Sequence, residues 1–359
     1  MRRFLLLFLI LVIAVVLFAW LQLRAATMQH LVLPEGSYTL LVVEGDTLTK
    51  TIYKLQAQGI LSHARWLLLY AQFRKNTAIR QGEYSLTPDL TGEALLQQFN
   101  RGRVLEYRIT FVEGSTLADA IQLLSSQEKM INDIDSMDAN HYKALLGFTQ
   151  EQGEGWVFPD TYSYVKGTKM SEILLRAYRR MQNILNEEWE KKAKDLPYKS
   201  PYHALIMASI IEKETGVAYE RPKIAGVFVR RLKKGMRLQT DPSVIYGVGR
   251  NFKGDLKRSH LLEETPYNTY TIDGLPPTPI ALPGRAAIHA ALHPDESSAL
   301  YFVARGDGTH SFSNNYEQHQ RAVAQHQLRR AGDYRSAPPE KVPVFKKTES
   351  SPPASRSAQ

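Results

Sequence analysis

The 359-residue sequence contains no cysteine. This excludes disulfide staples, thiolate metal sites and a cysteine nucleophile, but it does not identify the compartment, because an exported protein can simply avoid thiols. A glycine-rich phosphate loop and a G-x-S-x-G elbow are also missing, so the sequence carries neither signature. His289 and His293 stand four residues apart, but no H-E-x-x-H motif accompanies them. We therefore expect no metal and no other cofactor.

Acidic residues are fewer than basic ones, at 36 against 45, which gives a formal charge of +9. Net charge alone can attract nucleic acid, but it does not specify a fold or a reaction. Apolar residues make up 43% of the chain, which is enough for real cores, and the length suggests roughly two or three folded units. The distribution of the charge is therefore more informative than its sum.

Charged residues are absent from residues 4–23. Twenty helical residues span about 30 Å, the thickness of the hydrocarbon core of a bilayer. The alternative is a cleaved signal peptide, whose apolar region is usually about 7 to 15 residues long and precedes a cleavage site of small residues. Trp20, Gln22 and Arg24 occupy that place here. We therefore predict an uncleaved transmembrane anchor.

Basic residues flank this span unequally. Arg2 and Arg3 precede it, whereas Arg24 is the only basic residue after it until Lys50. The positive-inside rule then keeps residues 1–3 in the cytoplasm and exports the remainder of the chain. An exported body does not meet chromosomal DNA, so we expect no nucleic-acid partner.

The exported part divides into four predicted segments. Residues 24–37 are a short tether, residues 38–125 and 126–332 are folded, and residues 333–359 form a Pro/Ser/Lys-rich tail that we predict to be disordered. A short motif occurs twice, as VEGDTL at 43–48 and VEGSTL at 112–117, each time between a strand-like run and an amphipathic helix. On these residues alone, the repeat is either part of a polymer-binding unit or only a good strand-to-helix turn.

Residues 200–216, SPYHALIMASIIEKETG, predict a helix through a core, because the run from Ala204 to Ile211 is apolar apart from Ser209. Glu212 and Glu214 follow at its C-terminal end. Two positions on a helix correspond to about 200° of rotation, so these carboxyls cannot face each other as an acid and base pair. A carboxyl group at the edge of an apolar interior has a raised pKa, as a general acid requires. Spacing favours Glu214 only slightly, and an ordinary ion-pairing role remains the alternative.

Polar residues gather in two later segments. The first, at 236–247, contains Gln239, Thr240 and Asp241, and the second, at 264–284, contains Tyr267 and Asn268 before a proline-rich run. Amides and phenols beside a rigid wall are typical of sugar recognition. We predict that these five residues contact a glycan, with Asp241 as the second carboxylate if one takes part.

Four ordered motifs then point to a family: GWVFPDTYSY at 155–164, ASIIEKETG at 208–216, RLQTDPSVIYG at 237–247 and TPYNTYTIDGLPPTPIALPG at 265–284. Together they resemble the YceG-like family of endolytic murein transglycosylases. The resemblance implies an α+β protein with one N-terminal transmembrane helix, a LysM-like glycan-binding region over residues 38–125 and a mixed α+β catalytic domain over residues 126–332. The second glutamate of the EKET motif, here Glu214, is the implied catalytic acid and base.

The resemblance also implies a setting and a reaction. The protein would be a single-pass protein of the cell inner membrane, with a periplasmic catalytic domain, peptidoglycan strands as substrate and peptidoglycan synthases as partners. Glu214 would cleave the MurNAc-GlcNAc bond of nascent strands without water, leaving 1,6-anhydroMurNAc ends and terminating glycan elongation. Two alternatives stay open, namely a two-carboxylate hydrolase at the same site and a non-enzymatic glycan-binding scaffold.

Overall fold

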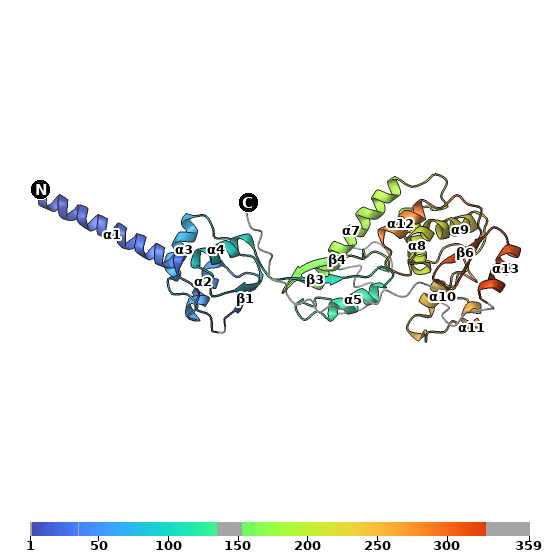
Figure 1. Ribbon diagram of the computed structural model, residues 1–359, viewed down its shortest axis with the longest axis horizontal. Coiled ribbons are helices and arrows are strands. Elements are labelled where there is room, and N and C mark those ends of the chain that lie inside the picture. The colour runs from blue at the N-terminus through green and yellow to red at the C-terminus, as the bar shows by residue number, and fades with distance from the viewer. Residues whose placement is uncertain (1, 35, 135–152, 328–359) are drawn as a thin grey trace.

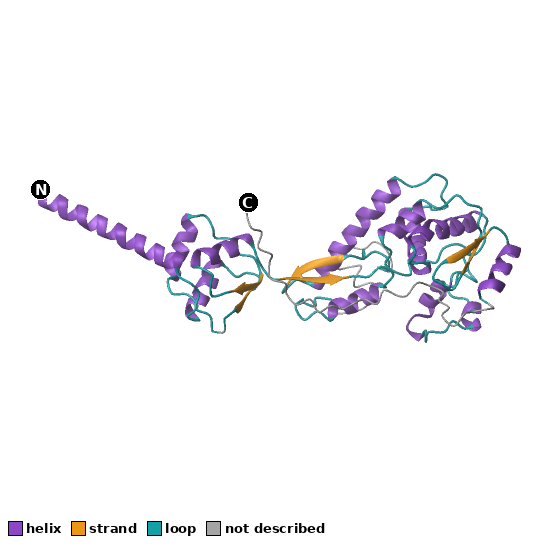
Figure 2. Cartoon of the chain, viewed as in Figure 1, coloured by secondary structure: helices purple, strands orange, loops and turns teal. Residues whose placement is uncertain are grey.

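The computed structural model describes residues 2–34, 36–134 and 153–327. The architecture is mixed α+β, as predicted, and the strands in this part pair two by two into antiparallel sheets. Helices and loops account for most of the chain (Figure 2). A long helix projects from a small unit, which joins a larger unit near strand β3 (Figure 1). The predicted tail at 333–359 lies outside the described residues.

Helix α1, Arg2–Met28, contains the whole predicted span. Its most apolar stretch has a mean hydropathy of 3.3 and none of it is buried in the protein, so the helix is long and apolar enough to cross a membrane. Its last turn differs, because Ala26 is fully buried where α1 packs on helices α3, Ala64–Phe73, and α4, Gly92–Arg101. Residues 24–28, predicted as part of a tether, instead continue the helix into the fold.

The small unit is a two-stranded sheet covered by helices. Strand β1, Tyr38–Val42, pairs antiparallel with β2, Gly82–Leu86, so that Tyr38 lies opposite Leu86. Helix α2, Leu48–Ala57, and helix α3 lie between these strands in sequence. One core joins them to α4 and to the end of α1, and its largest buried side chains include Leu40, Ile52, Leu67, Tyr84 and Phe99.

The larger unit begins with an antiparallel pair, β3, Glu106–Thr110, and β4, Thr161–Val165. The main helices of its core are α5, Leu117–Ser125, α7, Met170–Glu190, α8, Pro201–Glu214, α9, Arg221–Lys233, and α12, Arg285–Leu292. Strands β5, Tyr301–Ala304, and β6, His310–Ser313, form an antiparallel hairpin, and α13, Tyr316–His326, packs on it. Short helices complete the unit: η1, Ala218–Glu220, α10, Asp241–Val248, η2, Gly249–Asn251, and α11, Arg258–Leu262.

The boundary between the units lies earlier than residue 125. The small core ends with Phe99 and the larger core starts with Ile109. Helix α5 buries Ile121 and Leu124 in the larger core, and β3 pairs with a strand about fifty positions later. The predicted division at 125/126 therefore differs from the packing, because local sequence does not reveal a partner strand that follows so late.

The repeated motif builds the same turn in both units. Thr47 accepts a hydrogen bond from the Lys50 amide at the start of α2, and Thr116 accepts one from the Asp119 amide at the start of α5. Gly45 and Gly114 adopt φ of 84° and 80°, a left-handed conformation that glycine tolerates without strain. The two copies are thus capped strand-to-helix turns that belong to different cores.

A buried carboxylate joins the two units. Glu83 of β2 accepts hydrogen bonds from the Tyr107 hydroxyl at 2.6 Å and from the ammonium groups of Lys166 at 2.9 Å and Lys129 at 3.3 Å. Burial opposes its ionisation, but these donors outweigh that effect and hold the pKa of Glu83 below its ordinary value. Its backbone carbonyl also accepts from the Leu105 amide at 2.7 Å. We name this contact the Glu83 clasp.

Candidate active site

Helix α8 runs through the larger core, as its sequence predicts. Pro201 occupies the first turn, and every residue from Ala204 to Ile211 is buried. Helix α12 packs along it. The regular helix ends at Glu214, and Thr215 already has an extended backbone. The last turn of α8 therefore places its two glutamates at the edge of the apolar core.

These two glutamates face different neighbours, which confirms the predicted opposite orientation. The Glu212 carboxylate accepts from the Gly284 amide at 3.0 Å and from Arg221 at 3.3 Å. Its pKa is raised by burial, against the effect of these two donors. The Glu214 carboxylate instead accepts a hydrogen bond from the Thr240 hydroxyl. Glu212 is thus a structural ion-pairing residue, whereas Glu214 lies among polar groups from other segments.

Burial raises the pKa of Glu214 from 4.5 to about 7. The hydrogen bond from Thr240 lowers the pKa, the negative charge of Asp241 raises it, and the positive charge of Arg231 lowers it. The side chain is only partly buried, so a substrate can reach it. A carboxyl group that is half protonated near neutral pH can both donate and accept a proton, which suits general acid–base chemistry.

Thr240 is held firmly in place beside Glu214. Its amide donates to the Thr269 hydroxyl at 2.9 Å, and its carbonyl accepts from the Ser243 hydroxyl at 2.9 Å. The preceding residue, Gln239, has φ of 54° and donates its amide to the Thr269 carbonyl at 3.1 Å. A left-handed conformation is uncommon for a residue with a side chain, so its surroundings impose this turn.

Asp241 starts helix α10 next to this contact. Its side chain is exposed and accepts from the Tyr270 hydroxyl at 2.6 Å. Burial raises the pKa of Tyr270 above its ordinary value, and the nearby carboxylates of Asp241 and Glu214 raise it further. The phenol therefore stays protonated and acts as a donor. Glu214 and Asp241 therefore lie close enough to interact electrostatically, and Asp241 is the more exposed of the two.

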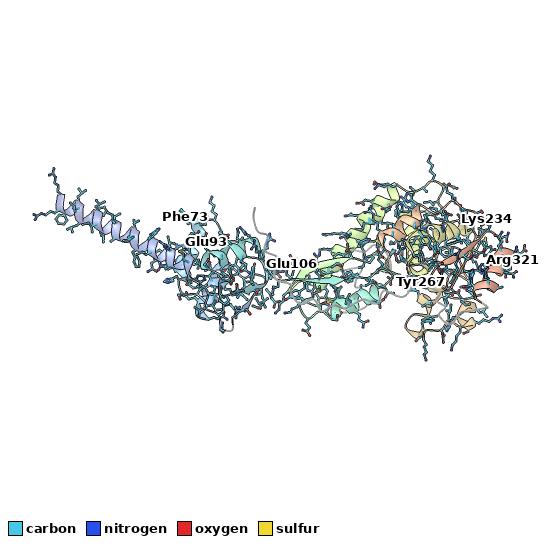
Figure 3. The ribbon with its side chains drawn as sticks, viewed as in Figure 1. Phe73, Glu93, Glu106, Lys234, Tyr267 and Arg321 are labelled. Atoms are coloured by element: carbon cyan, nitrogen blue, oxygen red, sulfur yellow. The ribbon has the colours of Figure 1, made fainter. Side chains whose placement is uncertain are left out.

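The structure divides the predicted glycan contacts into two groups. Gln239 and Asp241 are exposed and Tyr267, labelled in Figure 3, is partly exposed, so a ligand can reach these three side chains. Thr240 and Asn268 are buried, with 1% and 0% of their surface exposed. The prediction that they touch the glycan is therefore corrected, because buried side chains with internal hydrogen bonds have no free face.

Asn268 organises the loop that precedes the proline-rich run. The two N–H groups on its Nδ2 are shared among three backbone carbonyls, those of His260, Leu261 and Glu263, at 3.1, 3.1 and 2.6 Å. Its carbonyl accepts from the Tyr270 amide at 3.0 Å. All the hydrogen bonds that a side-chain amide commonly makes are thus used internally. The residue holds Tyr270, and through it Asp241, in position.

Glu154 is a second carboxyl group of raised pKa, which residue patterns did not single out. It is 5% exposed and accepts from the Leu117 amide at 3.0 Å, the Gly155 amide at 3.2 Å and the Tyr246 hydroxyl at 3.2 Å. Burial raises its pKa to about 7 despite these donors. It connects the start of α5 to α10, the helix that begins at Asp241. The only available signal was its place beside the GWVFPDTY motif.

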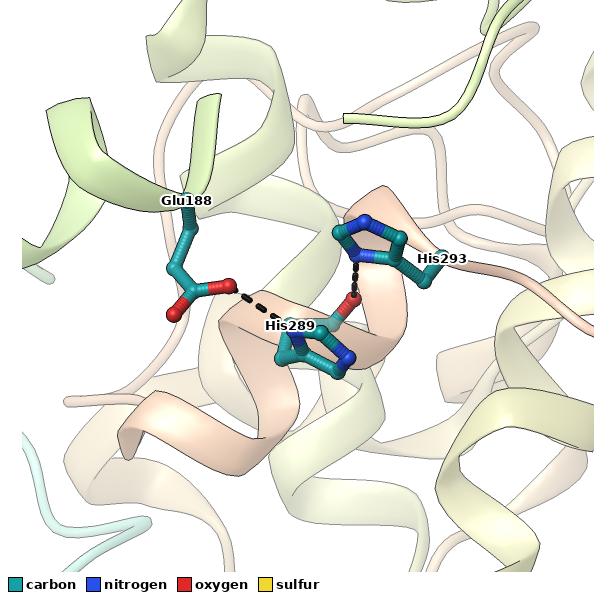
Figure 4. A group of neighbouring side chains, drawn as sticks. All are labelled: Glu188, His289 and His293. Atoms are coloured by element: carbon teal, nitrogen blue, oxygen red, sulfur yellow. Dashed lines mark hydrogen bonds and ion pairs between the residues drawn. The ribbon is translucent and has the colours of Figure 1, made fainter. Parts of the chain in front are cut away.

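Three possible metal ligands come together in the described residues, Glu188, His289 and His293 (Figure 4). Glu188 lies 2.8 Å from His289 Nδ1 and also binds Arg285 at 2.8 Å. The two imidazole rings stack at 4.2 Å, and the nitrogens of His293 lie against the carbonyls of His289 and Lys191. Each of the three side chains already has partners within the protein, since Glu188 contacts Arg285 and His289 and both nitrogens of His293 lie against carbonyls. We interpret this cluster as a polar link between α7 and α12.

The model of the YceG-like family matches residues 40–325. The chain belongs to the YceG-like family. Its relatives include an endolytic murein transglycosylase of Bacillus subtilis, 29% identical over 298 residues that cover 78% of this chain and 82% of that protein. An endolytic murein transglycosylase of Streptococcus pneumoniae is 27% identical over 322 residues, which cover 80% of this chain and 58% of the pneumococcal protein.

A solved structure agrees with this membership. The crystal structure of a YceG-like protein from Listeria monocytogenes has a TM-score of 0.51 and 29% sequence identity, and the match covers 79% of this chain and 98% of that one. The family match includes α8 and all four motifs, so Glu214 and its neighbours lie within it.

Proposed function

We propose that this protein is a membrane-anchored lytic transglycosylase that cleaves peptidoglycan glycan strands internally. Support comes from membership of the YceG-like family and from relatives named endolytic murein transglycosylases. The observation that carries the proposal is the single partly buried carboxyl group of Glu214, with a pKa raised to about 7 and a hydrogen bond from Thr240.

The first half of the reaction uses Glu214 as an acid. Its protonated carboxyl group donates to the glycosidic oxygen between MurNAc and GlcNAc, and the bond from the MurNAc anomeric carbon to that oxygen breaks. The GlcNAc side leaves as an alcohol and positive charge develops at the anomeric carbon. Glu214 becomes a carboxylate, which Arg231 stabilises electrostatically.

The second half uses the same group as a base. The Glu214 carboxylate takes the proton from the C6 hydroxyl of the same MurNAc residue, and the C6 oxygen bonds to the anomeric carbon to give a 1,6-anhydro end. One carboxyl group suffices for both proton transfers, because the nucleophile belongs to the substrate and no water is activated. The reaction returns Glu214 to its protonated form.

A hydrolase at the same site is the second possibility. Asp241 favours it, because its exposed carboxylate interacts with Glu214 and could orient a water molecule. A third possibility is a scaffold that binds glycan without cleaving it. In the transglycosylase mechanism, Asp241 and its partner Tyr270 form one wall of the site, and Gln239 and Tyr267 contact the glycan.

The N-terminal part of the chain bears on where the protein lies in the cell. We propose that α1 is an inner-membrane anchor with Arg2 and Arg3 in the cytoplasm and the two folded units in the periplasm. The small unit, with its first VEGDTL turn, serves as a LysM-like glycan-binding module. An enzyme held at the membrane meets nascent strands as synthases release them, and it would terminate their elongation there.

Product analysis tests the proposal. The full chain in detergent is incubated with uncross-linked glycan strands, and the new ends are analysed by mass spectrometry. A transglycosylase leaves MurNAc ends that are lighter by one water than the reducing ends left by a hydrolase. Reducing ends would replace the proposed chemistry with hydrolysis, and strands that bind but stay intact would support the scaffold.

A further inference from the structure

Arg231, on α9, carries a buried positive charge close to the site. The residue is 7% exposed, and its guanidinium group lies 5.1 Å from the centre of the Tyr301 ring. Among the described residues, no carboxylate lies within ion-pair distance of it, unlike Arg221, which contacts Glu212. Keeping an unpaired charge buried is costly, so this position has a specific reason to hold an arginine.

The donors of Arg231 converge on the segment that leads to Thr240. They reach the carbonyl oxygens of Arg237 at 3.2 Å and Leu238 at 2.8 Å, and the Gln239 side-chain oxygen at 3.4 Å. These three contacts come from Nη1, and the Nε N–H donates to the Leu300 carbonyl at 2.8 Å. Two neighbouring nitrogens of one planar group thus hold three consecutive residues against the end of the hairpin.

The clamped segment is the one with the unusual backbone. Gln239 has a left-handed φ, and hydrogen bonds hold both sides of its turn, from Arg231 on one side and to Thr269 on the other. Thr240 follows directly and donates its hydroxyl to Glu214. If the clamp is lost, the turn can relax and the hydroxyl moves away from the carboxyl group.

We infer that Arg231 is the positioning residue of the catalytic acid: it fixes Thr240 against Glu214 and supplies the charge that favours the carboxylate once the proton is given up. This inference rests on the proposed function of Glu214. Arg231 is 7% exposed and its Nε and Nη1 groups donate to backbone carbonyls and to the Gln239 side chain, so we assign it to holding this turn and not to binding the glycan.

The charge of Arg231 changes the pKa of Glu214 in a definite direction. Four groups face Glu214: Thr240 and Arg231 lower its pKa, Asp241 raises it, and Tyr270 stays a neutral phenol. Removing the Arg231 charge therefore raises the pKa of Glu214. Because the acid step needs the protonated form, the falling alkaline limb of the pH–rate profile moves to higher pH as the maximal rate drops.

The experiment compares Arg231→Gln and Arg231→Lys with a matched control, Arg230→Gln. Arg230 neighbours Arg231 on the same helix and likewise donates to backbone carbonyls, those of Ala299 and Asp295 at 2.7 Å, but away from the site. We expect Arg231→Gln to lower kcat about 100-fold with little change in KM, as a displaced catalytic geometry does. Arg231→Lys restores the pH profile but only part of kcat, because lysine keeps the charge and loses the planar group. Arg230→Gln leaves the profile in place.

A stability cycle tests the same coupling without any activity. Melting temperatures are measured for wild type, Arg231→Gln, Glu214→Gln and the double variant, all as full chains. We expect the loss caused by Arg231→Gln to be larger in the wild-type background than in the Glu214→Gln background at about pH 8.5, by about 2 to 4 °C, and equal at about pH 5.5, where Glu214 is neutral.

Equal losses in both backgrounds at both pH values would overturn the inference, as would an unchanged pH–rate profile with kcat lowered equally by the Arg230 and Arg231 variants. Failure of the proposed function is a different result, namely that wild type and Glu214→Gln act alike on glycan strands. The stability cycle still decides the link between Arg231 and Glu214 in that case.

Discussion

The substitution Glu214→Gln would keep the shape of the side chain that we propose as the acid and remove its proton. The introduced amide oxygen can still accept the hydrogen bond from Thr240, so the surrounding turn stays in place. General acid catalysis contributes about 10² to 10⁴ in rate, which corresponds to roughly 3 to 5 kcal/mol of transition-state stabilisation. We therefore expect kcat for strand cleavage to fall by at least about 100-fold, with binding of the glycan retained.

The same substitution changes stability in a direction that the pKa fixes. Folding raises the pKa of this carboxyl group from 4.5 to about 7, so protonation of Glu214 favours the folded state. This contribution is full below pH 4.5 and is lost as the pH rises through 7. Ionised Glu214 therefore destabilises the fold above pH 7 by up to about 3 kcal/mol. Glu214→Gln removes this cost, so it should melt no lower than wild type at about pH 8.5.

The assay pairs product mass spectrometry with thermal melting, at about pH 6 and about pH 8.5. Glu212→Gln is the matched control, because Glu212 lies two residues away and faces Gly284 and Arg221. It should keep cleavage within about tenfold of wild type, since it does not face the site. Cleavage at the wild-type rate by a folded Glu214→Gln protein would refute our assignment of the acid.

Three further predictions concern residues that hold the site and the two units together. Glu154→Gln should stabilise the protein above pH 7, because the pKa of Glu154 is raised on folding as that of Glu214 is. Glu154→Leu should instead destabilise the protein at every pH, by about 1 to 3 kcal/mol for each backbone amide left without an acceptor. Melting curves would measure both effects. Asn268→Ala should lower kcat and cost about 2 to 4 kcal/mol, because three carbonyls lose the two N–H donors that they share; unchanged kinetics would contradict its role in placing Tyr270. Glu83→Gln should weaken the Glu83 clasp by only about 1 kcal/mol, since its lysine partners are partly exposed, and small-angle scattering should show a wider spread between the units.

Local sequence was sufficient to predict the helices that form from contacts between residues close together in the chain. The helix from Pro201 to Glu214 and the apolar N-terminal helix follow from runs of apolar residues within a few turns of chain. The opposite orientation of Glu212 and Glu214 follows from helix geometry alone. Glu214 could thus be proposed as an acid before its surroundings were known, although spacing alone did not separate it clearly from Glu212.

Contacts between segments far apart in the chain could not be predicted from local sequence. Sequence placed Thr240 and Asn268 among polar residues near the site, but only packing shows that both are buried and bind the protein itself. The Glu154 contacts join segments 37 and 92 positions apart. Polar residue types are the same whether they face a substrate or an internal carbonyl, so composition does not distinguish these roles.

The chain by itself determined that one end is an apolar helix, that a dry helix ends in glutamates, and that four ordered motifs resemble one family. Tertiary structure decided which glutamate meets Thr240 and Asp241, where the small unit ends, and why Arg231 is buried. The physical reason is that hydrophobic periodicity acts within a few turns of chain, whereas pKa values and hydrogen-bond partners depend on groups that only folding brings together.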